Sequence, residues 1–217
     1  MQEYQRKTKA DLRLRERDLT VLSWICEQYA ARVDHLATLT GTGRATGERI
    51  GARLHAAGLA RRVQVLVSQP TWVIPTAKGL FVCGLRYRLW KPKLATLAHV
   101  GAMNDVRLHI QTQKPESEWL SERQLTAEAK DQAGARRHVP DGVLLLAGHS
   151  VAIEVELNVK NPSRLEAILD DLVERFDGIL YYCAPGPHRK LKQLEESERW
   201  PSLGVRELPR PTGLEGL

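Results

Sequence analysis

The sequence is poor in cysteine and in long apolar runs, and each shortage excludes a class of protein. Its 217 residues include only three cysteines, Cys26, Cys83 and Cys183, which are far apart in the chain. An odd number of scattered cysteines supports neither a disulfide framework nor a zinc site. The start of the chain shows no signal-peptide pattern, and no stretch of about twenty apolar residues could span a bilayer. We therefore expect a cytoplasmic protein that does not enter a membrane.

The charge is spread unevenly along the chain. Residues 1–110 hold 18 Lys and Arg against 8 Asp and Glu, whereas the remainder holds 14 against 18. A basic front half indicates a polyanionic partner such as nucleic acid, and the alternative is a merely soluble basic surface. The overall composition, with 42% hydrophobic and 27% charged residues, is typical of a folded protein. The length suits two small domains or one large one.

The front half has the element order of a winged helix-turn-helix domain. Apolar residues at helical spacing and turn-forming glycines predict three helices, and apolar runs around Gln69-Pro70 predict two strands. We expect helices over residues 14–31, 33–39 and 44–57, strands over 60–68 and 71–74, and a short helix after Pro75. The predicted organisation is a basic arm (1–13), a winged helix-turn-helix DNA-binding domain (14–84), a basic linker (85–94) and a C-terminal domain (95–217).

The third helix is the candidate for reading DNA. Its apolar residues, Ile50, Leu54 and Ala57, form one stripe, and its basic residues fall largely on the other side among small residues. A helix with small and basic residues on its outer face can lie in a major groove. The candidate DNA-binding residues of the front half and linker are Arg44, Arg49, Arg53, His55, Arg61, Arg62, Arg86 and Arg88. The alternative for the domain is a solvated helix face on a protein–protein adaptor. The alternative for the linker is a segment that only connects the domains and is held in place by the packing of its aromatic residues.

The back half predicts an α/β layer. We expect helices over residues 94–111, 162–178 and 188–198, strands over 179–183 and 205–208, and an ambiguous segment over 118–125. Between them, Val139 to Lys160 reads as a β-hairpin that turns at Gly148-His149-Ser150.

The hairpin gathers three carboxylates. Because side chains alternate along a strand, Glu154 and Glu156 share one face at a spacing of roughly 7 Å. Asp141 opens the neighbouring strand, so antiparallel pairing brings it beside them. Acids held this close repel each other unless a positive group lies between them, and a divalent cation with oxygen ligands, Mg²⁺ or Mn²⁺, is the natural candidate. Asp141, Glu154 and Glu156 are therefore candidate metal ligands, with Glu122 as a weaker candidate and Asp105 as a further possible acid.

These residues carry a resemblance to known families. Pro140-Asp141, twelve residues and then Glu154-Val155-Glu156 resembles the PD-(D/E)XK nuclease-like superfamily, in which the pattern lies on a hairpin. From about Leu14 to Leu194 the chain resembles the replication-relaxation family of plasmids and other mobile elements, which couples a winged helix to such a domain. The motifs shared with that family are Thr76-x-x-Gly79-Leu80, the helix from His99 to Arg107, Trp119 with Glu122, Pro140-Asp141 and Glu154-Val155-Glu156-Leu157. The resemblance implies a DNA-binding protein with a nuclease-like C-terminal domain.

The chain departs from the nuclease pattern at its lysine. That superfamily places a lysine two residues after the second acid, and here the position holds Glu156 or Asn158, depending on which glutamate is the acid. Lys160 would lie on the same strand face as these positions, but one alternation of the strand beyond Asn158. Three interpretations of the acids follow: catalytic metal ligands, with Lys160 as the lysine; a degenerate nuclease fold kept as a scaffold; and solvated acids paired with Arg123, Arg136 or Arg164.

Two functions of different classes remain open, beside the adaptor. The first is a double-stranded DNA-binding regulator of transcription or replication in a mobile element, with a degenerate nuclease-like domain. The second is a metal-dependent endonuclease that uses Asp141, Glu154, Glu156 and Lys160. By analogy with other winged-helix regulators, we expect a homodimer.

Overall fold

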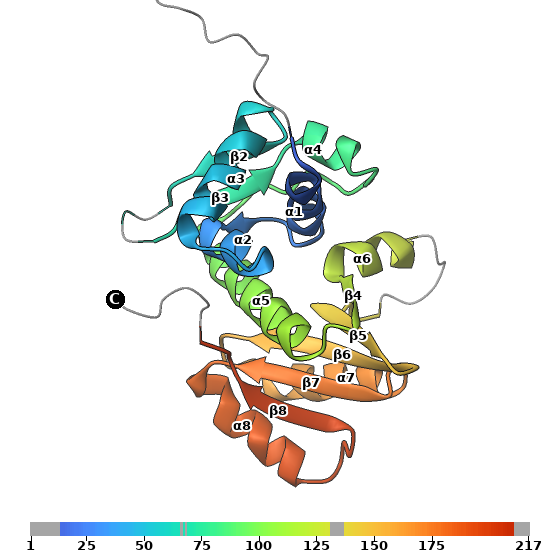
Figure 1. Ribbon diagram of the computed structural model, residues 1–217. Coiled ribbons are helices and arrows are strands. Elements are labelled where there is room, and N and C mark those ends of the chain that lie inside the picture. Colours follow the sequence, from blue (N-terminus) through green and yellow to red (C-terminus); the bar gives the residue numbers. More distant parts are fainter. Residues whose placement is uncertain (1–13, 66, 68, 131–136, 211–217) are drawn as a thin grey trace, which may run out of the picture.

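The computed structural model describes residues 14–65, 67, 69–130 and 137–210. Within these ranges the chain forms eight helices and two β-sheets, a mixed α+β fold as predicted (Figure 1). The predicted basic arm lies outside the described residues. None of the helices in the described ranges combines the length and the apolarity that crossing a bilayer requires.

The N-terminal region, residues 14–84, packs helices against a small antiparallel sheet of order β1-β3-β2. Its elements are α1 (Glu16–Glu27), β1 (Ala31–Arg32), α2 (Val33–Leu39), α3 (Arg44–Ala56), β2 (Ala60–Val63), β3 (Trp72–Pro75) and α4 (Ala77–Val82). The fully buried side chains of Leu22, Leu36 and Ile50 form its core. At Gly47 the two helices α2 and α3 approach so closely that a Cβ atom would lie 2.1 Å from the carbonyl oxygen of Val33. Only glycine fits this crossing.

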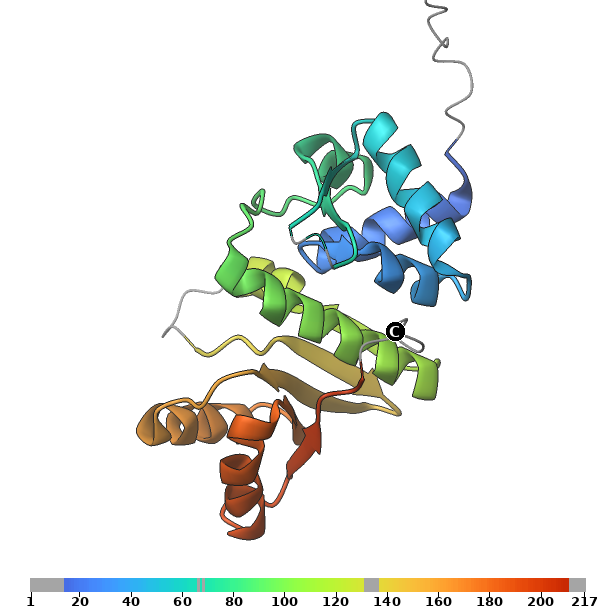
Figure 2. The ribbon, with the colours of Figure 1, turned by 90° about the vertical axis from the view of Figure 1, so that its left-hand side faces the viewer.

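The C-terminal region, residues 94–210, is built on a five-stranded sheet of order β4-β5-β6-β7-β8. Its elements are α5 (Leu94–Gln113), β4 (Glu118–Ser121), α6 (Glu122–Lys130), β5 (Gly142–Leu146), β6 (His149–Glu156), α7 (Pro162–Val173), β7 (Gly178–Cys183), α8 (Pro185–Glu196) and β8 (Leu203–Glu207). Strands β4, β5 and β6 pair antiparallel, and β6, β7 and β8 pair parallel through the crossover helices α7 and α8. Figure 2 shows α5 on one face of this sheet and α7 and α8 on the other.

Both faces of the sheet are covered, which explains why β6 is buried over most of its length. Ile153 and Val155 pack with α5, whereas Ala152 packs with α7 and α8. The alternation predicted for β6 is therefore confirmed, and Glu154 and Glu156 share the parity of Ala152. The hairpin is also confirmed, but its turn consists of Ala147 and Gly148, both with positive φ, rather than Gly148 to Ser150.

Several predicted boundaries were wrong. Helix α1 ends at Glu27, because Tyr29 takes a positive φ of 69°, which no helix continues. The segment 118–125 is a strand followed at once by a helix, which explains its ambiguous periodicity. Helix α7 ends at Val173, before the predicted residue 178, and α8 begins at Pro185, where proline suits a first turn. Strand β2 ends at Val63, and Leu66 and Ser68 of the predicted strand lie outside the described residues.

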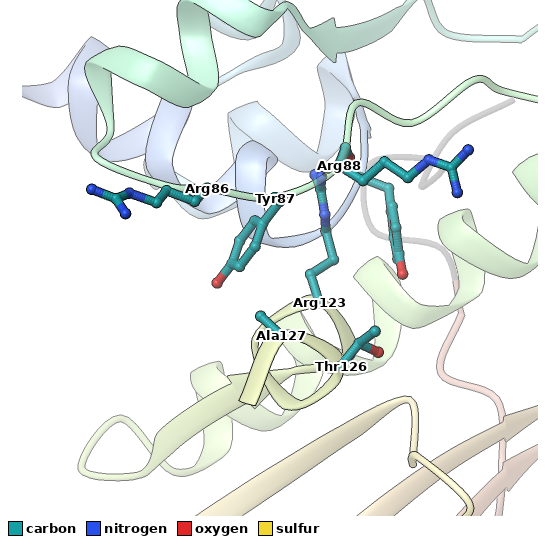
Figure 3. Close-up of a pocket in the computed structure, with 7 residues that line it drawn as sticks. Arg86, Tyr87, Arg88, Arg123, Thr126 and Ala127 are labelled. Atoms are coloured by element: carbon teal, nitrogen blue, oxygen red, sulfur yellow. Dashed lines mark hydrogen bonds between the residues drawn. The ribbon is translucent and has the colours of Figure 1, made fainter. Parts of the chain in front are cut away.

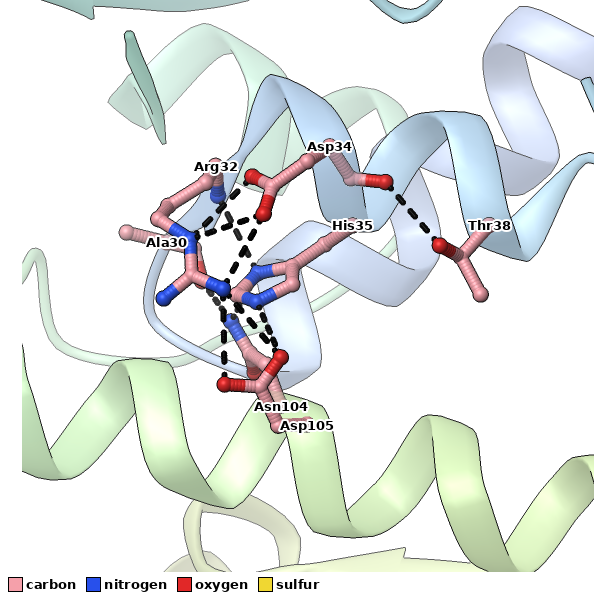
Figure 4. A network of polar contacts seen from close by, with 7 residues as sticks. All are labelled: Ala30, Arg32, Asp34, His35, Thr38, Asn104 and Asp105. Carbon is pink, nitrogen blue, oxygen red and sulfur yellow. Dashed lines mark hydrogen bonds and ion pairs between the residues drawn. The ribbon is translucent and has the colours of Figure 1, made fainter. Parts of the chain in front are cut away.

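Helix α5 joins the two regions through buried polar contacts as well as apolar ones. Asp105 of α5 lies 3.2 Å from Nη2 of Arg32 and 3.0 Å from Nε2 of His35 (Figure 4). The next residue along the helix, Asn104, donates from Nδ2 to the carbonyl of Ala30 at 2.8 Å. Every partner in this network is buried or nearly so, and the carboxylates of Asp34 and Asp105 share the Arg32 guanidinium. The hypothesis that Asp105 adds an acid to the hairpin cluster is therefore wrong, because it faces the N-terminal region.

Candidate functional site

The basic residues predicted to bind DNA fall into two groups with different surroundings. Arg44 and Arg49 are exposed on α3, and Arg61 is exposed on β2, the strand that follows α3. In the part of the chain that the structure describes, none of the three makes an ion pair, and Arg49 donates only to the carbonyl of Ala45 one turn earlier. Their charges therefore face solvent and are not paired with a carboxylate, since Glu48 of the same helix pairs with Arg62.

Other arginines of the same surface are already engaged. Arg53 forms a two-pronged ion pair with Asp18, whose carboxylate is fully buried, with Nη2 2.6 Å from Oδ1 and Nε 2.9 Å from Oδ2. Arg62 pairs with Glu48 of α3. His55 is exposed, and its Nδ1 lies 3.2 Å from the carbonyl oxygen of Ala60. Arg53 thus stabilises the contact between α3 and α1. The sequence predicted that it contacts DNA, but its guanidinium is engaged by Asp18.

Arg86 and Arg88 lie apart from α3. They flank a pocket between the segment that joins α4 to α5 and helix α6, which also supplies Arg123 (Figure 3). The aromatic residues of this segment pack inward, with Tyr87 against Arg123 and Trp90 against Tyr29 at 5.6 Å between ring centroids. The segment is therefore both packed by its aromatic residues and lined by exposed arginines, so the two interpretations of it are not exclusive.

The three hairpin acids do come together, in a second pocket of about 320 Å³ at the end of β6. Asp141 precedes β5 and accepts a hydrogen bond at Oδ2 from the backbone N–H of Val155, at 2.8 Å. The pairing of Gly142 with Ile153 fixes this position, since it sets Asp141 beside Glu154. The residues that line the pocket are His99, Glu122, His138, Val139, Asp141, Glu154, Val155, Glu156, Leu157, Asn158 and Lys160.

Each of the three hairpin acids faces a basic side chain. Nε2 of His99 lies 3.0 Å from Oδ1 of Asp141, and Nε2 of His138 lies 2.6 Å from Oε1 of Glu154. Lys160 completes the set, with Nζ 2.6 Å from Oε2 of Glu156 and 3.9 Å from Oε2 of Glu154. The contact with Glu156 is an ion pair whose angles fall outside those of a hydrogen bond. Basic side chains of the protein therefore lie beside the acids, where the sequence predicts a divalent cation.

Burial dominates the electrostatics of the pocket. It raises the pKa of Glu154 to about 7, against the opposing effect of the His138 hydrogen bond, and the like charge of Asp141 adds to the rise. Burial also raises the pKa of Glu122, again with a contribution from Asp141. For His99, burial favours the neutral ring, but the hydrogen bond and charge of Asp141 outweigh it and raise the pKa. Burial therefore favours the protonated carboxyl of Glu154, and Asp141 favours the protonated ring of His99.

Metal binding by these residues is not evident in their arrangement. Carboxylate oxygens suit Mg²⁺ and Mn²⁺. However, Oδ1 and Oδ2 of Asp141 and Oε1 of Glu154 are already in contact with His99, Val155 and His138. Across the described ranges, no three His, Cys, Asp or Glu side chains are grouped as they would be around a metal ion. Metal ligation by Asp141, Glu154, Glu156 and Glu122 stays a prediction.

Sequence reasoning missed the two histidines. His138 stands 16 positions before Glu154 and His99 stands 42 positions before Asp141, so no local pattern joins either histidine to its acid. Of the arginines proposed as partners of the acids, Arg123 instead donates to two backbone carbonyls and Arg164 is exposed, with no ion pair in the described ranges. Arg136 lies outside the described residues.

Comparison of the chain with protein-family models, with curated proteins and with solved structures finds no match.

Proposed function

We propose that the protein binds double-stranded DNA through α3 and β2 of its N-terminal region, as a regulator of transcription or replication in a plasmid or another mobile element. The observation that carries this proposal is the group of exposed arginines without carboxylate partners, Arg44, Arg49 and Arg61. Such residues are free to contact phosphates and base edges.

The order of elements supports the same proposal. The element order α1-β1-α2-α3-β2-β3, with the sheet order β1-β3-β2, agrees with the winged helix-turn-helix arrangement that the sequence predicts, in which the third helix would enter the major groove. The small residues Ala45 and Ala52 are exposed on α3, so a groove can approach the helix closely. In the same proposal, the C-terminal region is a nuclease-like domain that acts as a scaffold, and the active form is a homodimer.

A gel-shift series on a random-sequence duplex at increasing salt tests DNA binding. The triple variant Arg44→Ala/Arg49→Ala/Arg61→Ala should bind at least about tenfold more weakly, with a log–log salt slope lower by roughly 1 for each phosphate contact removed. The matched control is Arg164→Ala/Arg189→Ala/Arg210→Ala, which removes three exposed arginines of the C-terminal region that make no ion pair in the described ranges. Wild-type affinity that does not depend on salt, or equal losses in the two variants, would contradict the proposal.

A second candidate function is metal-dependent cleavage of DNA in the pocket at the end of β6. The observation that favours it is that Asp141, Glu154 and Lys160 line one pocket, with Lys160 reaching both glutamates from the loop after the strand. The acids also lie on the β5-β6 hairpin, which is where the resemblance to the nuclease-like superfamily implies them.

Incubation with supercoiled plasmid, with and without Mg²⁺ or Mn²⁺, decides between scaffold and nuclease. A nuclease requires metal-dependent nicking that Asp141→Ala abolishes and that Glu174→Gln, a change at an exposed acid of the segment after α7, leaves intact. DNA binding without nicking would show that the pocket is not catalytic and that the C-terminal region acts as a scaffold.

A further inference from the structure

The pocket between the joining segment and α6 has the features of a binding site in its own right. It has a volume of about 330 Å³, at the lower end of the range of about 300–1,000 Å³ that is usual for small-molecule sites. The residues that line it are Tyr29, Arg86, Tyr87, Arg88, Arg123, Thr126 and Ala127. Three of the seven carry a positive charge and none carries a negative one.

Arg123 is the buried centre of this pocket. Its guanidinium group lies between two aromatic rings, 4.8 Å from the ring centroids of both Tyr29 and Tyr87. It donates from Nη1 to the carbonyl of Cys26 at 2.6 Å and from Nη2 to the carbonyl of Arg88 at 2.7 Å. Both acceptors are neutral, and within the described ranges Arg123 forms no ion pair.

A buried guanidinium without a carboxylate is costly, because its charge has lost water and gained no counter-ion. Burial accordingly lowers the pKa of Arg123, against the smaller opposing effects of its neighbours. The carboxylate whose charge acts on Arg123, that of Glu122, lines the pocket of the hairpin acids. An anion that enters beside Arg123 would offset this cost.

The rim of the pocket adds two more cations. Arg86 and Arg88 are exposed and extend to either side of the pocket (Figure 3), and in the described ranges neither side chain makes an ion pair. Guanidinium groups match the oxygen geometry of phosphate, and tyrosine rings give a surface on which a base can stack. Two hydrogen bonds to backbone carbonyls hold Arg123 in place, so the central guanidinium has a defined position in the pocket.

We propose that this pocket binds a nucleotide through its phosphate, with Arg123, Arg86 and Arg88 as the phosphate-binding residues and Tyr87 as the stacking surface. The nucleotide is either free or part of a single strand. This site is separate from the DNA-binding surface of α3 and does not depend on it. It adjoins the pocket of the hairpin acids, since Glu122 and Arg123 are consecutive residues that line one pocket each.

Isothermal titration of the full chain tests the proposal with four probes: deoxyadenosine 5′-monophosphate, deoxyadenosine, inorganic phosphate, and a single-stranded hexanucleotide. We expect the monophosphate to bind at least about tenfold more tightly than the nucleoside and than inorganic phosphate, a difference of about 1.4 kcal/mol. Tighter binding of the hexanucleotide than of the monophosphate would identify a strand as the ligand, and equal or weaker binding a free nucleotide. Both outcomes support the site.

The double variant Arg86→Ala/Arg88→Ala should reduce monophosphate affinity at least about tenfold. Both residues are exposed, so the circular dichroism spectrum should not change. The matched control, Arg44→Ala/Arg49→Ala, should bind the monophosphate as the wild type does and bind duplex DNA more weakly, which separates this site from the proposed function. The proposal is wrong if no probe binds at millimolar concentration, if nucleoside or inorganic phosphate matches the monophosphate, or if the two double variants lose equal affinity.

Discussion

The two candidate sites of the molecule use charge in opposite ways. On α3 and β2, Arg44, Arg49 and Arg61 are exposed and face no carboxylate in the described ranges, whereas in the hairpin pocket Glu154 and Glu156 are buried and face His138 and Lys160. The first arrangement leaves its charge available to an external partner, and the second satisfies its charge internally. A count of charges along the sequence gives the sign of each region, but only the contacts tell which charges are free.

The contrast also exists within a single helix. Arg49 and Arg53 are one turn apart on α3, yet the first is exposed and the second is paired with a fully buried carboxylate. Four predictions test these contrasts, from the largest expected effect to the smallest.

Arg53→Ala should lower the free energy of unfolding by about 3 kcal/mol, because it leaves the carboxylate of Asp18 buried without its partner. Urea denaturation at neutral pH measures the effect. The double variant Asp18→Asn/Arg53→Met, which removes both charges, should recover much of the loss. A loss below about 0.5 kcal/mol for Arg53→Ala would show that the ion pair contributes little and that Arg53 belongs with the free arginines.

The free energy of unfolding should fall as pH rises from 5 to 8. The folded-state pKa values of Glu154 and His99 are both raised, so their contribution is present at low pH and is lost as pH rises through these values. The expected fall is on the order of 2 kcal/mol, since one pKa unit corresponds to about 1.4 kcal/mol and the neighbouring cations offset part of it. Urea denaturation of Glu154→Gln should show a flatter pH profile. An identical profile in the variant would mean that Glu154 does not hold its proton in the folded protein.

Lys160→Met should lower the free energy of unfolding by about 1 kcal/mol at pH 8, because the two buried glutamates then lack a cation between them. The side chain of Lys160 is 26% exposed, so solvent reduces the effect below that of a fully buried pair. At pH 5 the loss should be smaller, since Glu154, whose pKa is raised to about 7, is then protonated and needs no cation. Lys114→Met, at the exposed C-cap of α5, provides the control. A loss for Lys160→Met that is equal at both pH values would exclude an electrostatic cause.

Arg49→Ala should change the free energy of unfolding by less than about 0.5 kcal/mol, because the side chain is exposed and contacts only the backbone of its own helix. The same change should reduce the salt slope of DNA binding by about 1. Thermal denaturation and gel shift on one preparation measure both. A large loss of stability would show that Arg49 has a structural role, and an unchanged salt slope would show that it does not contact a phosphate.

The order of the elements and the face of each strongly periodic one could be predicted from the sequence, since these depend on local patterns. Helices α2 and α3 were placed to within a residue, and the alternation along β6 correctly put Glu154 and Glu156 on one face. Strand β1 was missed because two residues carry no pattern, and it exists only through pairing with β3.

The partners of the charged residues could not be predicted. Asp18 and Arg53 are 35 positions apart, and His99 and Asp141 are 42 apart, so neither pair leaves a local signal. The sequence showed that the acids of the hairpin required positive neighbours. Which side chains meet that requirement depends on how α5 lies across the sheet.

Helix α5 has a consequence for how such a chain can evolve. Its residues belong to three separate clusters: Leu97 and Val100 pack with Trp72, Leu108 packs in the core of the N-terminal region, and Met103 and Val106 pack on the five-stranded sheet. Recombination that exchanged either region at residues 85–94 would place one side of this helix against residues of another protein, with which it is not matched in shape or polarity. The two regions are therefore expected to be inherited together, and changes on either side of α5 are constrained by the other.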